Sequence, residues 1–184
     1  MGGIIRSLIE AYKRKDPSAR SGLEIILLYP GVRALFFHRA AHFLYKNKVP
    51  FFPRLIAECS RLLSGIEIHP GAVIGKNVVI DHGMGIVIGE TAIVADDVLI
   101  FHGVTLGSTH FKEGKRHPTI ESGAILGAGS KILGDIVIGH DARVGANSVV
   151  LMSVPEKVSV AGIPAKIISK GSQAFEEWNF DYYI

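Results

Sequence analysis

The sequence has little of what a secreted, membrane-bound or nucleic-acid-binding protein needs. Its 184 residues contain one cysteine, Cys59, which excludes a disulfide framework within the chain and fits a reducing cytosol. Without a run of roughly 18 apolar residues or a basic segment leading into an apolar stretch, we expect neither a membrane span nor a secretion signal. The net charge is only +3, and no basic cluster alternates with aromatic residues, which argues against nucleic-acid binding. We therefore expect one cytoplasmic domain with at most a small appendage, and a mild positive charge that favours a small polyanionic ligand.

A six-residue repeat of aliphatic residues runs from Ile68 to Pro155. Its anchors are Ile68, Ile74, Ile80, Ile88, Val94, Ile100, Leu106, Ile120, Leu126, Ile132, Ile138, Val144 and Val150. Four residues after most anchors stands a second small or aliphatic residue, such as Ala72 or Val78. The period fits neither a helix nor a plain hairpin, so it predicts short strands linked by tight corners and stacked as a parallel β-helix.

Residues 1–64 have the spacing of helices instead. Asp16 and Pro17 predict the start of a second helix, with Asp16 as N-cap and Pro17 at the first helical position. Further helices are expected after Pro30 and up to about Ser64. The chain is thus expected to comprise a short helical N-terminal domain (1–64), a β-helix domain (65–170) and a flexible tail (171–184), which makes it mainly β with N-terminal helices.

The repeat is interrupted twice, and both interruptions contain a histidine. Two extra residues lie within 81–85, which include His82, and eight lie within 107–119, which include His117. An insertion into a regular solenoid leaves the core intact and builds on one face. These two places are therefore where chemistry is expected.

With three hexads per coil, as in the repeat families that this pattern resembles, every third anchor is expected to lie above the previous one. In one such column the residues two positions after the anchors point outward, and they are His82, His102, Ala128 and Ala146. The two histidines would lie at one end of a groove, and the small residues would leave room for an extended ligand. A solvated surface is the alternative, since His140 occupies the same place in another column.

Several segments around the interruptions and in the helical part form recognisable motifs, namely Arg-Lys-Asp-Pro (14–17), Ile-Asp-His-Gly-Met-Gly (80–85), Ile-Gly-Glu-Thr-Ala (88–92), His-Gly-Val-Thr-Leu-Gly (102–107) and Gly-Lys-Arg-His-Pro-Thr (114–119). Together they resemble bacterial serine O-acetyltransferases of the hexapeptide-repeat acyltransferase superfamily. The resemblance covers nearly the whole chain and implies a left-handed prism. It also implies transfer of acetyl from acetyl-CoA to L-serine, which gives O-acetyl-L-serine and CoA in the first step of cysteine biosynthesis, without a metal.

The resemblance assigns the catalytic and serine-binding residues. His82 would be the general base, with Glu67 orienting its ring, although many family members have aspartate at that position. Asp16 and Asp81 would hold the ammonium group, and Arg116 and His117 would lie around the carboxylate and the reacting centre. His117 could instead be a second acid or base. A helix cap for Asp16 and a solvated loop for Arg116 and His117 are the alternatives.

CoA would run along the column of small residues. The resemblance places Gly107, Ser108, Ala128 and Ala146 along it, with Lys131 and Lys166 as candidates for its phosphates or as merely solvated lysines. Ser108 departs from the second glycine that is common in the family, and it could narrow the acetyl site.

The resemblance also implies partners. L-cysteine would be a feedback inhibitor at the serine site. The protein would form a homotrimer or a dimer of trimers, with His82 and His117 meeting across subunits. The acidic, aromatic tail ending at Ile184 would dock into O-acetylserine sulfhydrylase, unless it is an ordinary frayed terminus.

Three other functions compete with this assignment. A carbonic-anhydrase-like β-helix would bind zinc through histidines, but His82, His102, His110 and His117 lack the close histidine pair of that family. His38 and His42 imitate part of a helical zinc site. The other two are acetyl transfer to a sugar, an antibiotic or another hydroxyl acceptor, and a purely structural role.

Overall fold

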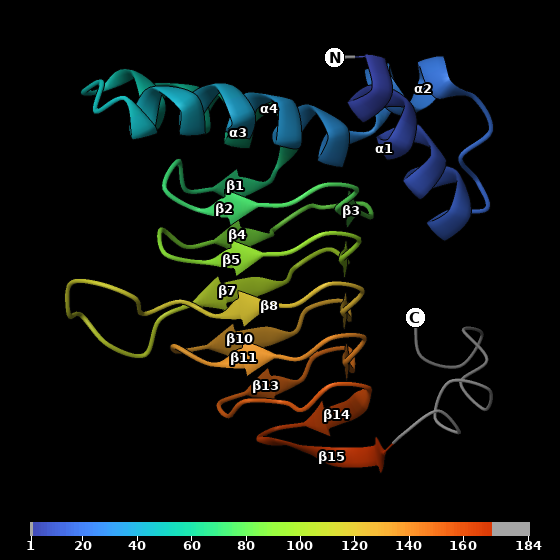
Figure 1. Cartoon of the computed structure of the whole chain (residues 1–184), viewed down its shortest axis with the longest axis vertical. Coiled ribbons are helices and arrows are strands. Elements are labelled where there is room, and N and C mark those ends of the chain that lie inside the picture. The colour runs from blue at the N-terminus through green and yellow to red at the C-terminus, as the bar shows by residue number, and fades with distance from the viewer. Residues whose placement is uncertain (1, 171–184) are drawn as a thin grey trace.

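The structure is a computed structural model that describes residues 2–170, and in that range helices come first and short strands follow (Figure 1). The helices are α1 (Gly2–Lys15), α2 (Gly22–Leu28), α3 (Pro30–Lys46) and α4 (Phe52–Ser64). None of the helices in this part of the chain combines the length and the apolar character that a membrane span needs. The predicted tail 171–184, with Ile184, lies outside the described residues.

The strands form three sheets, which the chain visits in turn. The first sheet contains β1 (Glu67–Ile68), β4 (Val87–Ile88), β7 (Thr105–Gly107), β10 (Lys131–Leu133) and β13 (Val149–Val150). The second contains β2 (Val73–Ile74), β5 (Ile93–Val94), β8 (Thr119–Ile120) and β11 (Val137–Ile138). The third contains β3 (Val79–Ile80), β6 (Leu99–Ile100), β9 (Ile125–Leu126), β12 (Arg143–Val144), β14 (Val158–Gly162) and β15 (Ala165–Lys170).

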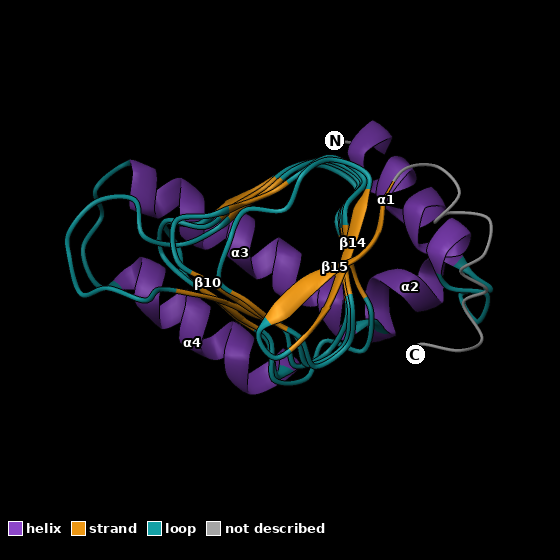
Figure 2. Cartoon of the chain, turned by 90° about the horizontal axis from the view of Figure 1, so that it is seen from below, coloured by secondary structure: helices purple, strands orange, loops and turns teal. Residues whose placement is uncertain are grey.

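Pairing within each sheet is parallel, except for the antiparallel pair of β14 and β15. Because successive strands belong to successive sheets, the chain winds into a prism, which Figure 2 shows end-on as a stack of superimposed coils. The predicted parallel β-helix with N-terminal helices is confirmed.

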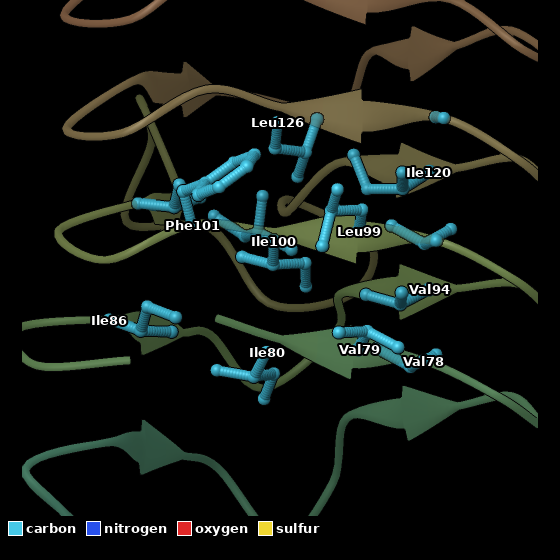
Figure 3. Packing of buried hydrophobic residues seen from close by; sticks show 14 of the residues in the cluster. Val78, Val79, Ile80, Ile86, Val94, Leu99, Ile100, Phe101, Ile120 and Leu126 are labelled. Carbon is cyan, nitrogen blue, oxygen red and sulfur yellow. The ribbon is translucent and has the colours of Figure 1, made fainter. Parts of the chain in front are cut away.

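The core of the prism consists of the repeat anchors and the small residues between them. Ile80 pairs with Ile100, Ile100 with Leu126, and Leu126 with Val144, so anchors of one column lie above one another. Figure 3 shows Ile80, Ile100 and Leu126 of this column. Every predicted anchor is buried except Ile74, which is half-buried on the edge strand β2. Burying one aliphatic side chain fully stabilises the fold by about 1.5–3 kcal/mol, so the repeat itself supplies much of the stability.

Helices α3 and α4 form a hairpin that lies across the first coil, as Figure 1 shows. Pro30 begins α3 and Gly65 ends α4 in the left-handed conformation (φ 71°), as the sequence predicted. The predicted N-cap at Asp16 is wrong. Helix α2 begins later, with the Ser21 hydroxyl accepting a hydrogen bond from the Glu24 N–H (3.1 Å). Proline disfavours the helical conformation for the residue before it, which fits the end of α1 at Lys15, and the Asp16 carboxylate accepts from the Ser18 N–H (2.8 Å) within a short turn that does not continue into a helix.

A close contact ties the helices to the edge strand β3. The Tyr12 hydroxyl donates to the Ile80 carbonyl oxygen and accepts from the Ile80 N–H, both at 3.2 Å, so it satisfies backbone groups that lack a neighbouring strand. Burial raises the pKa of Tyr12 far above its usual range, which keeps the hydroxyl protonated. A Cβ on Gly31 of α3 would lie 2.5 Å from the same carbonyl oxygen, so only glycine allows this approach. The contact places the end of α1, and with it Asp16, beside the turn that follows β3.

Candidate active site

His82 lies on the turn that the first interruption builds between β3 and β4. His82 (φ 57°) and Gly83 (φ 83°) are consecutive left-handed residues. At the same corner of the later coils, the left-handed residues are Gly103, Gly129 and Asn147, each three residues after its anchor, as Gly83 is after Ile80. His82, two residues after Ile80, is the additional left-handed residue at this corner. A left-handed histidine is uncommon and costs about 1–2 kcal/mol, and such strain is typical of functional sites. The inserted residues thereby project His82 outward, with its side chain 76% exposed.

The predicted column is confirmed by the strand register. The rings of His82 and His102 meet edge to face, with centroids 6.1 Å apart. Below them come Ala128, half-buried, and Ala146, exposed. The Lys131 ammonium group donates to the Gly103 carbonyl oxygen, so this lysine also lies at the column. The surface below His82 is therefore a strip of small side chains with a cation at its edge.

Two carboxylates face the same corner as His82. Asp81 Oδ1 lies 3.8 Å from His82 Nε2. Burial raises the pKa of Asp81, and the neighbouring His82 acts against this rise. The nearby Asp16 carboxylate raises the pKa of Asp81 further. Burial also acts to raise the pKa of Asp16, but hydrogen bonds from Ser18 (2.7 and 2.8 Å) and from the Tyr29 hydroxyl (2.8 Å) hold it below its usual range. Two neighbouring carboxylates repel each other, so the corner favours a cation between them.

Glu67 stands at the start of β1, beside Val87 of β4. Among the described residues, no hydrogen bond or ion pair joins Glu67 to His82, whose nearest acidic partner is Asp81. The predicted orienting role of Glu67 stays a prediction.

His117 lies at the end of the second interruption and is held from several sides. It is 8% exposed. The Thr91 N–H donates to His117 Nδ1 (3.2 Å), and Thr91 Oγ1 lies 2.9 Å from the same nitrogen. A Cβ on Gly89 would lie 2.1 Å from the ring, so glycine makes the space that the imidazole occupies. Burial and the Arg116 charge lower the pKa of His117, while Glu90 opposes the shift.

Arg116 is fixed by the neighbouring coil. Its guanidinium pairs with Glu90 (2.5 Å) and also donates to the Gly114 carbonyl oxygen (3.3 Å). Glu90 accepts a further hydrogen bond from the Tyr45 hydroxyl of α3 (3.0 Å), and the bonds from Arg116 and Tyr45 lower the pKa of Glu90. The sequence alone indicated no role for Tyr45, Glu90 or Thr91. Glu90 and Thr91 belong to the matching segment Ile-Gly-Glu-Thr-Ala (88–92), which could have drawn attention to them. Their contacts depend on the path of the loop 107–119, which the sequence does not give.

The second interruption also forms a hollow of about 730 Å³, lined by Glu90, Thr91, residues 108–114 and Arg116. Among the lining residues, the Ser108 hydroxyl donates to the His110 carbonyl oxygen (2.6 Å) and accepts from the His110 N–H (3.0 Å). Ser108 therefore shapes the start of the loop after Gly107. Lys166 is exposed on β15, opposite Ala161, near the far end of the column.

The predicted site residues thus form two groups at different corners of the prism. Asp16, Asp81 and His82 gather where the third sheet leads to the first, whereas Arg116 and His117 stand where the first sheet leads to the second. One chain does not bring the two groups together.

The histidines of the helical part are a packing pair. The rings of His38 and His42 lie 5.5 Å apart, and His42 Nδ1 is 2.8 Å from the Pro70 carbonyl oxygen. Within residues 2–170, no group of three or more histidine, cysteine, aspartate or glutamate side chains is arranged to hold a metal ion.

Comparisons with known proteins agree with this architecture. Residues 117–151 match the family described as bacterial transferase hexapeptide (six repeats). A serine acetyltransferase of Synechococcus elongatus is 56% identical over 84% of this chain and 63% of its own length. One of Mycobacterium tuberculosis is 49% identical over 98% of this chain and 78% of its own length.

Solved structures are similar over most of the chain. A serine acetyltransferase of Brucella abortus in complex with coenzyme A superimposes with a TM-score of 0.90 and 42% identity, and the match covers 93% of this chain and 68% of the other. A serine acetyltransferase in complex with cysteine has a TM-score of 0.88 and 38% identity over 91% of this chain and 69% of the other.

Proposed function

Because the chain belongs to the serine acetyltransferase family, we propose that it transfers the acetyl group of acetyl-CoA to the hydroxyl of L-serine, which gives O-acetyl-L-serine and CoA. The observation that carries the proposal is the match to serine acetyltransferases at 49% identity over 98% of the chain. Cysteine biosynthesis is the process to which this reaction belongs.

The structure supports His82 as the general base. A serine hydroxyl is a weak nucleophile until its proton is removed during attack, and histidine is the side chain whose ordinary pKa suits that task. His82 is exposed, and no hydrogen bond among the described residues occupies its ring nitrogens. It would take the hydroxyl proton while the serine oxygen attacks the thioester carbonyl carbon, and the C–S bond would then break to release the CoA thiolate. Glu67 is proposed to orient the ring when the site is complete.

Charges at the two corners match a zwitterionic amino acid. Asp16 and Asp81 would hold the ammonium group, since a cation relieves the repulsion between them. Arg116 would bind the carboxylate, because its guanidinium is already fixed by Glu90 and keeps further N–H donors. Cysteine shares the ammonium and carboxylate groups of serine, so we propose that it competes at this site, as the cysteine complex of a similar protein suggests.

CoA is proposed to lie along the column of small residues, as the coenzyme A complex of a similar protein supports. Ala128 and Ala146 would allow the pantetheine arm to approach the backbone. Gly107 and Ser108 would lie near the thioester, and Lys131 and Lys166 would bind phosphate oxygens.

We further propose that the complete site forms between subunits of a homotrimer, or of a dimer of trimers. The loop of residues 108–118 projects from the prism in Figure 1, and Phe111 on it is fully exposed. A neighbouring prism would cover Phe111 and bring Arg116 and His117 to the His82 corner of the next chain.

Mixing two variants that each damage a different half of the site tests this arrangement. At serine concentrations well below KM, where each variant alone should be strongly impaired, trimers assembled from equal amounts of His82→Ala and Arg116→Ala chains should reach about a quarter of the wild-type rate, because a random ring pairs two intact halves at one interface in four. Mixed trimers no more active than the separate variants would place each site within one chain.

Two further proposals concern the cell. The tail ending at Ile184 would bind O-acetylserine sulfhydrylase, since a terminal carboxylate with an aliphatic anchor is a known recognition mode. The cytoplasm is the proposed compartment, because Cys59 is a free, exposed thiol that a reducing environment preserves.

Release of thiol from acetyl-CoA tests the proposed function. Purified protein should release thiol in the presence of L-serine, and the acetyl ester should appear on the serine oxygen. Sugars and aminoglycosides in place of serine test the competing acceptors. Thiol release with one of them but not with serine would overturn the assignment.

A further inference from the structure

Resting on the proposed function, we infer that Thr91 fixes the tautomer of His117, so that the neutral ring presents an Nε2–H donor to an anionic oxygen of the substrates and does not act as a base. The two histidines would then divide the work, with proton removal at His82 and charge stabilisation at His117. Thr91 is in this sense a positioning residue.

The tautomer follows from the donors around His117 Nδ1. The Thr91 backbone N–H, which can only donate, points at Nδ1 from 3.2 Å. A nitrogen that accepts a hydrogen bond carries no proton, so in the neutral ring the proton resides on Nε2.

The Thr91 hydroxyl reinforces this arrangement. Its oxygen accepts from the N–H groups of Arg116 (3.0 Å) and His117 (3.1 Å), which occupies both lone pairs. The remaining O–H can only donate, and His117 Nδ1 lies 2.9 Å away. Two donors therefore converge on one ring nitrogen, and the same hydroxyl holds the loop backbone that carries Arg116.

The other side of the ring remains available to a ligand. The Cδ2–Nε2 edge lies over Gly89, where a Cβ would approach both atoms to 2.1 Å. Among the described residues, His117 Nε2 has no hydrogen-bond partner. It is also not fully buried, so solvent can reach this nitrogen. In a protonated ring, the N–H on Nδ1 would face the Thr91 N–H, and the two donors would repel each other. Burial and the Arg116 charge lower the pKa of His117, and this direction also favours the neutral ring.

Nitrogen NMR of protein labelled with ¹⁵N-histidine tests the tautomer without substrates. At neutral pH, Nδ1 of His117 should have a pyridine-like shift and Nε2 a pyrrole-like shift, with the signal assigned by its loss in His117→Gln. Thr91→Val should move the Nδ1 resonance, whereas Thr91→Ser should keep it. A pyrrole-like Nδ1 in the wild-type protein would overturn the inference. Because this readout needs no turnover, it stands apart from the test of the proposed function.

Glutamine substitutions test the division of roles. The amide of glutamine can place an N–H near the position of Nε2 but cannot take up a proton. His117→Gln should therefore keep activity within about tenfold of wild type, whereas His117→Ala should lose about a hundredfold, as expected for loss of one preorganised donor. At His82 the two substitutions should be equally damaging. If glutamine and alanine are equally damaging at His117 as well, His117 exchanges a proton and the inference fails.

Thr91 has a matched control. Thr91→Val should lower kcat/KM for serine by about tenfold, and Thr91→Ser should restore most of it, because the hydrogen bonds of one hydroxyl are at stake. Thr119→Val, two residues after His117 on β8, should leave activity unchanged. Equal activity of Thr91→Val and wild type would show that the hydroxyl does not position His117.

Discussion

The corner that carries His82 and the corner that carries His117 arise from insertions into one repeat, yet they hold their histidines in opposite ways. Two added residues bend the backbone through left-handed conformations and leave His82 76% exposed. Eight added residues return across the neighbouring coil and leave His117 8% exposed, with Thr91 bonded to its ring. A base must reach its substrate with an unoccupied nitrogen, whereas a group that stabilises charge gains from being fixed beforehand. The two insertions thus hold their histidines in ways that match the roles proposed for them.

Replacing the exposed histidine should have the largest effect. We expect His82→Ala to lower kcat by about a hundredfold or more, because a positioned base contributes 10²–10⁴-fold to proton transfer. Since the side chain is exposed, the melting temperature should change little. Thiol release at saturating serine and acetyl-CoA measures the first, and thermal unfolding measures the second.

His140 is the matched control for this variant. It occupies the same place in another column and pairs with its neighbour Asp141 (3.0 Å). His140→Ala should keep full activity. Comparable losses in the two variants would mean that an outward histidine at this position serves the prism and not the reaction.

The fixed corner should respond next, and through substrate binding. Arg116→Ala should raise KM for serine by about tenfold to a hundredfold, since a charge-assisted hydrogen bond contributes about 1.5–3 kcal/mol. KM for acetyl-CoA should stay near its wild-type value. Arg116→Lys should recover only part of the loss, because lysine keeps the charge but lacks the planar fork that pairs with carboxylates.

Initial rates with each substrate varied in turn separate these effects. A rise in KM for acetyl-CoA, with serine unaffected, would move Arg116 from the amino-acid site to the CoA site and remove the proposed contrast between the corners.

How far the sequence could predict the two corners depends on what holds each one. The column of His82, His102, Ala128 and Ala146 follows from counting hexads, because strand register in a solenoid is fixed by the buried anchors. The contacts of Thr91 and Glu90 with the long loop could not be predicted from the repeat, because the path of an irregular loop has no period.

The error at Asp16 has the same origin. Asp followed by Pro matches the start of a helix, but here the carboxylate binds Ser18 and Tyr29, and Tyr29 stands after the next helix. Local patterns predict local structure well. Which side chains meet across elements, as Asp16 and Tyr29 do at this corner, is decided by tertiary packing.

His38 provides the smallest test, because it is buried like His117 but lies among the helices. Burial, with His42 and Arg39 nearby, lowers the pKa of His38 to about 4, and its Nδ1 has no hydrogen-bond partner among the described residues. In the unfolded chain a histidine titrates near pH 6.5, so its contribution to stability is present above about pH 6.5 and is lost as the pH falls towards 4. Between pH 7 and pH 5 the free energy of unfolding should fall by about 1–2 kcal/mol from this group. Urea unfolding at both pH values should show that fall in the wild-type protein and in His110→Gln, and a clearly smaller one in His38→Gln. An unchanged pH dependence in His38→Gln would mean that another group is responsible, and that burial does not lower the pKa of His38 as far as about 4.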